Sequence, residues 1–180
     1  MRFWRLLLRI ARWDVHITVP ERKKAIICVA PHTSNWDFII GLIAYRSVGR
    51  KAGFLMKSFW FFFPLKYILK SLGGIPVKKE PSQSLTSQII SDFKNSDQLV
   101  IAITPEGTRK GVEKWRTGFL TIAYGSYVPI ELGVIDYREK VVKIEREFIP
   151  TGNISEDLIK IRQYFSQFKE KALYPDKYIP

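Results

Sequence analysis

Short apolar runs alternate along this chain with longer segments in which apolar residues recur at helical spacing. The apolar runs, rich in Ile and Val, are typical of buried strands. They predict strands over residues 25–30, 54–56, 74–77, 99–103, 128–134 and 140–146. The helical spacing predicts helices over residues 35–48, 60–72, 82–95, 118–124 and 155–172. Alternating elements of this kind favour a single α/β domain with a mostly parallel, mixed sheet flanked by helices.

The first residues form a basic amphipathic pattern. Arginines at positions 2, 5, 9 and 12 are spaced three and four apart, so a helix would place them on one face. Such a helix is too short to span a bilayer, but it suits the plane of a membrane surface. We expect a membrane-surface helix over residues 1–16 and the main domain over residues 17–180. The alternative is a helix that docks on the domain with its arginines outward.

Composition narrows the choice of partner. The net charge is +12, which predicts an anionic partner: nucleic acid, anionic lipid or an acidic carrier protein. The 5 Trp, 8 Tyr and 12 Phe suit either a membrane interface or stacked nucleic-acid bases. With one Cys and 2 His, the chain cannot build a structural zinc site, and we expect no metal. The aromatic stretch at residues 59–65 indicates a membrane-touching or acyl-lining element, or simply core packing.

The most informative motif follows the predicted strand at 25–30. His32 precedes Asp37 by five positions, across a strand-to-helix turn that Pro31 begins. Ser34 or Asn35 can cap the following helix. An aspartate that holds one ring nitrogen of a histidine leaves the other free to take a proton. The pair predicts a general base, although Asp37 could instead only support the helix start.

A second motif follows the predicted strand at 99–103 and reads Pro-Glu-Gly-Thr-Arg at residues 105–109. Gly107 allows close approach of the backbone to a ligand, and Arg109 offers a planar fork of donors suited to phosphate. Alone, this segment could be a surface turn with a solvated arginine. Ligands in open α/β sheets bind at the carboxyl ends of strands, where both motifs fall.

Together the motifs resemble the lysophosphatidic acid acyltransferase family, as a short bacterial-type member. His32–Asp37 matches the family's histidine-x4-aspartate (HX4D) motif, and residues 105–109 match its Pro-Glu-Gly-Thr-Arg motif. Two weaker blocks occur in the expected order at residues 53–57 and 72–79, and a third similarity at 128–130. The resemblance implies a glycerolipid-acyltransferase-like fold. It also implies transfer of a fatty acyl group from acyl-ACP or acyl-CoA to the hydroxyl of 1-acyl-glycerol-3-phosphate, in phospholipid biosynthesis.

The resemblance also assigns residues. His32 and Asp37 would be catalytic, and the acceptor-binding residues would be Lys57, Lys79, Glu106, Gly107, Thr108 and Arg109. Lys79 stands where the family often has arginine, and lysine lacks the bidentate fork. Glu106 fits a buried, loop-organising carboxylate better than a base.

The reading implies no cofactor and no metal, because a thioester is already activated. The expected partners are an anionic membrane surface, a lysophospholipid and a carrier-protein or coenzyme A thioester, at the cytoplasmic face of the cell membrane, with no nucleic acid. Two alternatives stay open at this stage. One keeps the chemistry but uses a hydroxylated acyl-amino acid as acceptor. The other is a basic nucleic-acid-binding module, which explains the charge but not the two motifs.

Overall fold

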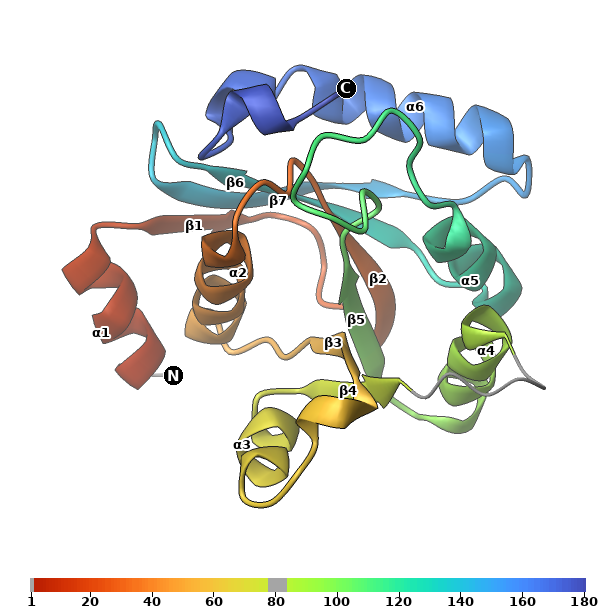
Figure 1. The fold of residues 1–180 in the computed structure, drawn as a ribbon, viewed down its shortest axis with the longest axis horizontal. Coiled ribbons are helices and arrows are strands. Elements are labelled where there is room, and N and C mark those ends of the chain that lie inside the picture. The colour runs from red at the N-terminus through yellow and green to blue at the C-terminus, as the bar shows by residue number, and fades with distance from the viewer. Residues whose placement is uncertain (1, 78–83) are drawn as a thin grey trace.

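A seven-stranded sheet crosses the middle of the protein, whose computed structural model describes residues 2–77 and 84–180 (Figure 1). The strands are β1 (Asp14–Ile17), β2 (Lys24–Val29), β3 (Gly53–Lys57), β4 (Gly74–Val77), β5 (Leu99–Ile103), β6 (Ile130–Asp136) and β7 (Val141–Phe148). Their order is β1-β7-β6-β2-β5-β3-β4. Only β6 and β7 pair antiparallel, and every other neighbouring pair is parallel. The predicted α/β fold with a mostly parallel sheet is confirmed.

Helices cover both faces of the sheet (Figure 1). They are α1 (Arg2–Ala11), α2 (Asn35–Ser47), α3 (Leu65–Ser71), α4 (Leu85–Asn95), α5 (Gly118–Ser126) and α6 (Ile154–Ser166). The largest core cluster joins α4, α5 and α6 to one face, and a smaller cluster joins α1 and α2 to the other. Strand side chains alternate between the two faces. On β2, for example, Ile26 and Cys28 belong to the first cluster while Ile27 faces α2 and belongs to a third.

Strands form where the apolar runs predict them, and one further strand, β1, was not predicted. β1 pairs in parallel with β7 at the edge of the sheet, where Asp14 and His16 are exposed. Its four residues are too few and too polar to register as a buried run. Residues 14–16, expected to belong to the N-terminal helical segment, are therefore part of the sheet.

Two predicted helices are shorter than the pattern suggests. The expected helix over 60–72 is a 3-10 turn at Ser58–Trp60 followed by α3, for which Pro64 is the N-cap. Proline disfavours helical backbone in the residue before it, so the segment cannot continue as one helix. The expected helix over 155–172 ends at Ser166 and is followed by a 3-10 turn at Lys169–Lys171. The start of the helix expected over 82–95 lies partly outside the described residues, and α4 begins after the cap Ser84.

Helix α1 has two apolar sides. Leu8 is buried against Ala44 of α2, as the docking alternative requires. On another side Phe3, Leu6 and Ile10 remain 61%, 55% and 71% exposed. Across the parts of the chain that the structure describes, no helix has the length and apolar character needed to cross a bilayer.

The C-terminal residues pack closely although their sequence shows no periodicity. Tyr178 is only 1% exposed and lies 6.2 Å from Trp115 between ring centroids. Ile179 lies close to Gly111. This segment therefore covers the loop that follows β5, which carries the second motif.

Candidate active site

The sheet order brings the two motifs together. β2 and β5 are neighbours and run in parallel, so the loops at their carboxyl ends leave the same edge. The loop after β2 leads into α2, and Ser34 caps this helix by accepting the backbone N–H of Trp36 at 3.1 Å. Asp37 occupies the N3 position and completes a capping box. The cap therefore holds Asp37 in place at the start of the helix.

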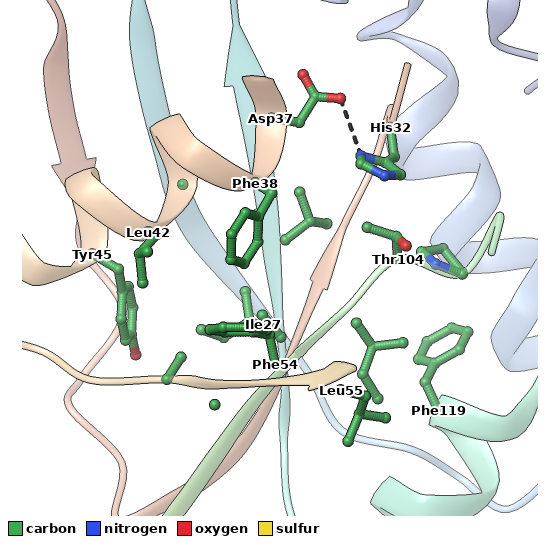
Figure 2. A pocket seen from close by; sticks show the side chains of 18 of the residues that line it. Ile27, His32, Asp37, Phe38, Leu42, Tyr45, Phe54, Leu55, Thr104 and Phe119 are labelled. Atoms are coloured by element: carbon green, nitrogen blue, oxygen red, sulfur yellow. Dashed lines mark hydrogen bonds and ion pairs between the residues drawn. The ribbon is translucent and has the colours of Figure 1, made fainter. Parts of the chain in front are cut away.

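Asp37 contacts the ring of His32 directly. His32 Nδ1 lies 3.1 Å from Asp37 Oδ2, with the two side chains 16% and 2% exposed. The same oxygen accepts the backbone N–H groups of Thr33 at 2.8 Å and Ser34 at 2.9 Å. Because a carboxylate only accepts, this contact requires the proton on Nδ1 of His32, and in the neutral imidazole Nε2 is then the nitrogen with the free lone pair. The predicted contact between His32 and Asp37 is confirmed (Figure 2).

The other oxygen of Asp37 has its own donor. The hydroxyl of Tyr137, from the turn after β6, donates to Asp37 Oδ1 at 2.6 Å. Burial and this hydrogen bond raise the pKa of Tyr137 above its ordinary value, so the phenol stays protonated. Sequence reasoning missed Tyr137, because nothing near it in the chain marks it as part of a site.

Glu106 holds the backbone of the same histidine. Its Oε1 accepts the N–H of His32 at 2.7 Å, across 74 positions of sequence. Its side chain is buried, and within the described residues its Oε2 has no hydrogen-bond partner. Burial, opposed by the bond from His32, raises the pKa of Glu106 to about 7. Glu106 lines neither of the two cavities of the site, which fits a loop-organising carboxylate.

The rest of the second motif lies beside the helix cap. Gly107 has a positive φ of 64°, and a Cβ there would lie 2.6 Å from Nε of Arg116. The positive φ therefore favours glycine, and any side chain at this position would also force the Arg116 side chain to move. Arg109 donates through Nη1 to the side-chain oxygen of Asn35, the first residue of α2.

A cavity of about 810 Å³ opens beside the histidine (Figure 2). His32 and Asp37 lie on one side of it, and Leu42, Phe54 and Phe119 belong to its apolar wall. The wall comes mainly from α2, β2, β3, β5 and the start of α5. The hydrocarbon lining suits an apolar chain, and His32 places an imidazole in the same cavity.

A second, polar cavity of about 340 Å³ is lined by the helix cap itself, from Thr33 to Asn35. Its lining includes three basic side chains, Arg109, Lys110 and Lys177. Thr108, Asn35 and Tyr174 also line it. The structure thus places a concentration of positive charge next to the start of α2, where backbone N–H groups also favour anions.

The predicted site residues do not all converge. His32, Asp37 and Gly107 line the apolar cavity, and Thr108 and Arg109 line the polar one. Lys57 ends β3, is exposed, and lines neither cavity. Lys79 lies outside the described residues.

Several residues at the site carried no signal in the sequence. Arg116 lines the apolar cavity and is fixed through its backbone N–H, which donates to Pro105 at 2.8 Å. Lys110 and Lys177 were not predicted either. Basic residues are common in this chain, so only their placement distinguishes these.

Within residues 2–77 and 84–180, no group of three His, Cys, Asp or Glu side chains is arranged to hold a metal ion. Cys28 lies buried in β2, and burial raises the pKa of its thiol well above the ordinary value. A thiol in that environment is an inert core residue.

The fold and the site thus define an α/β protein with a histidine–aspartate pair at an apolar cavity and a basic cavity at the adjoining helix cap. The sequence matches the Acyltransferase family model over residues 12–131, and the chain belongs to this family. It is an acyltransferase. Among solved structures it is similar to the 1-acyl-sn-glycerophosphate (LPA) acyltransferase PlsC from Thermotoga maritima, with a TM-score of 0.63 and 19% identity. That match covers 92% of this chain and 75% of the other. No curated protein sequence gives a significant match.

Proposed function

We propose that this acyltransferase moves a fatty acyl group from a thioester to the free hydroxyl of a lysophospholipid, most simply 1-acyl-glycerol-3-phosphate. The observation that carries the proposal is the position of His32. Its ring is held by Asp37 at 3.1 Å and lies at the edge of an apolar cavity of about 810 Å³. The basic cavity begins at the next residues, Thr33 to Asn35.

In the proposed reaction, Nε2 of His32 takes the proton of the acceptor hydroxyl as its oxygen attacks the thioester carbonyl. Asp37 holds the ring and stabilises the imidazolium that forms. When the carbon–sulfur bond breaks, the imidazolium returns the proton to the leaving thiolate. The ester oxygen is now bonded to the acyl carbon, and the enzyme ends in its starting state. The acyl chain would lie among the apolar side chains of the larger cavity.

The acceptor phosphate suits the polar cavity. Arg109 offers a bidentate fork, and Lys110 and Lys177 add positive charge within the same cavity. Lys57 remains a candidate for the approach of the acceptor rather than for its final contact, because it is exposed outside both cavities. The donor is acyl-ACP or acyl-CoA, and both are anionic at the end opposite the thioester. The net charge of +12 attracts either one, and it mildly favours the acidic carrier protein.

We further propose that the enzyme acts at an anionic membrane surface as a peripheral protein on the cytoplasmic face. Exposed aromatic side chains gather around the 3-10 turn and α3, where Phe59 and Phe63 are 79% and 76% exposed. Arg46 links this region to α1: its guanidinium lies over Trp4 and donates to the carbonyl of Ser71 at 2.8 Å. The exposed apolar residues of α1 and those near α3 could therefore enter one interface together.

One alternative keeps the chemistry and changes the acceptor to a hydroxylated acyl-amino acid, whose carboxylate would replace the phosphate. The nucleic-acid-binding hypothesis has less support, because membership of the family assigns an enzymatic activity that a binding module lacks.

The test is a mass-spectrometric assay of the purified protein with a panel of acceptors. Lysophosphatidate, neutral lysolipids and a hydroxylated acyl-amino acid are each offered with acyl-ACP and with acyl-CoA. We expect lysophosphatidate to be acylated fastest. Preference for the amino-acid lipid would transfer the proposal to that acceptor, and acylation of none of them would contradict it.

Membrane binding is tested by vesicle sedimentation. Replacing Leu6 and Ile10 by serine removes exposed apolar area from α1 but leaves the docked Leu8 in place. Replacing Phe59 and Phe63 by serine does the same near α3. We expect both variants to bind vesicles with anionic lipid more weakly, and high salt to weaken the wild type only partly. Unchanged binding of both variants would contradict a membrane role for these side chains.

A further inference from the structure

The hydrogen bond to Oδ1 of Asp37 comes from Tyr137, a residue that no sequence motif indicates. Tyr137 donates to Oδ1 at 2.6 Å, the shortest of the four contacts that the aspartate makes with Tyr137, Thr33, Ser34 and His32. The three other contacts all go to Oδ2. Without Tyr137, a carboxylate oxygen in a side chain that is 2% exposed would therefore lose its partner.

The backbone of Tyr137 is held from two directions. Its backbone N–H donates to the carbonyl of Lys171 at 2.9 Å, which ties it to the segment after α6. The preceding Asp136 accepts two backbone N–H groups of the same turn, each at 3.0 Å, and pairs with Lys171 at 3.2 Å. The position of the hydroxyl is therefore set by the β6–β7 turn and the C-terminal segment together.

The ring of Tyr137 has a packing partner on a third side. Trp13, which follows α1, meets it edge to face with ring centroids 5.2 Å apart. Both rings pack against the cluster that contains Leu8 of α1 and Ala44 of α2. Contacts thus run without a break from the N-terminal helix through Trp13 and Tyr137 to Asp37.

We propose that Tyr137 is a positioning residue for the reaction: its hydroxyl fixes the Asp37 carboxylate, and through it the ring of His32, while Trp13 fixes the tyrosine ring. Tyr137 lines neither cavity, so it acts through Asp37 and not on the substrates. The inference rests on the proposed roles of His32 and Asp37. It adds Tyr137 and Trp13, which follows α1, to the residues on which the reaction depends.

The first test is the Tyr137→Phe variant, which keeps the ring and its packing against Trp13. A hydrogen bond to a charged group contributes enough that kcat should fall roughly ten- to a hundredfold, while both Michaelis constants stay within about twofold. The matched control is Tyr127→Phe, at a tyrosine that is 91% exposed, and it should behave as the wild type.

A second measurement reports on His32 itself. The chain contains only 2 His, so ¹⁵N-histidine labelling gives two ring systems, and His32→Ala assigns them. We expect the wild-type His32 ring to carry its proton on Nδ1, and Tyr137→Phe to increase the fraction protonated on Nε2. Trp13→Ala should cause a smaller change in the same direction, and combining it with Tyr137→Phe should add little.

The outcomes separate this inference from the proposed function. If His32→Ala retains activity, the catalytic pair is misassigned, and the role of Tyr137 is wrong with it. If His32→Ala is inactive but Tyr137→Phe shows wild-type kcat and an unchanged histidine spectrum, Tyr137 only packs, and this inference alone is overturned.

Discussion

The segments that follow β2 and β5 each place one buried acid against His32: Asp37 from the first turn of α2, and Glu106 from the loop after β5. Asp37 lies five positions from the histidine, contacts its ring, and uses both oxygens as acceptors. Glu106 lies 74 positions away, accepts the backbone N–H of His32, and leaves one oxygen unpartnered among the described residues. Asp37 controls the orientation of the imidazole, and Glu106 controls the position of the backbone that carries His32.

The same division extends to the rest of each loop. The β2 loop supplies the proposed base, so changes there should act on kcat. The β5 loop carries Gly107 and Arg109 toward the cavities, so changes there should act on acceptor binding or on stability. Two motifs at one edge of a sheet can therefore be distinguished by the kinetic constant that each affects.

The largest effect is expected from His32→Ala, which removes the residue that both acids hold. General acid–base catalysis contributes about 10²- to 10⁴-fold, so kcat should fall by that amount. His16→Ala is the matched control, because His16 is exposed on the edge strand β1. Circular dichroism and thermal unfolding should show a folded protein. Near-wild-type turnover would remove His32 from the mechanism.

Asp37→Asn should cost about 10²-fold or more in kcat with little change in either Michaelis constant. The amide keeps the shape of the side chain but loses the negative charge that fixes the ring and stabilises the imidazolium. Steady-state kinetics with each substrate varied measure both constants. An effect confined to the Michaelis constants would contradict the assignment of Asp37 to the catalytic step.

Arg109→Ala should raise the Michaelis constant for the acceptor roughly ten- to a hundredfold, because a charged, bidentate contact is lost. The constant for the donor should change little. Lys57→Ala provides the comparison, and its effect should be smaller because Lys57 is exposed outside both cavities. A selective rise in the donor constant would show that Arg109 binds the other substrate.

Glu106→Gln should have its clearest effect on the pH dependence of stability. Burial raises the pKa of Glu106 from 4.5 to about 7, so the folded protein binds this proton more tightly than the unfolded chain. The stabilisation from the bound proton is full below about pH 4.5 and is lost as the pH rises through about 7. Glutamine cannot ionise, and it still offers an oxygen to His32. Between pH 5 and pH 8, the free energy of unfolding should therefore fall by about 1–3 kcal/mol less in the variant than in the wild type.

Chemical denaturation at pH 5 and pH 8 measures this difference. Glu131→Gln is the control, because burial also raises the pKa of Glu131 to about 7 and its hydrogen-bond partner is Tyr45 of α2, not the catalytic loop. It should flatten the pH dependence of stability similarly, although it does not contact the catalytic loop. An identical pH dependence in wild type and Glu106→Gln would mean that Glu106 does not titrate in this range.

Most of the fold could be predicted because its signals are local. Apolar runs locate β2, β5 and β6 without reference to their neighbours, and Ser34 with Asp37 forms a capping box within four residues. The failures also have local causes. β1 is too short and polar to stand out, and Pro64 divides an aromatic stretch that the spacing alone predicts as one helix.

The contact between His32 and Asp37 could be predicted from the sequence, because a strand-to-helix turn with a helix cap brings the two side chains within one turn of each other. The distant groups that complete the site become visible only in the folded protein. Glu106 reaches His32 because β2 and β5 are neighbours, and Tyr137 reaches Asp37, 100 positions away, because the fold places the β6–β7 turn beside the start of α2. Such contacts depend on the order of strands in the sheet, which no pattern of neighbouring residues encodes, since each strand's own apolar run is compatible with many orders.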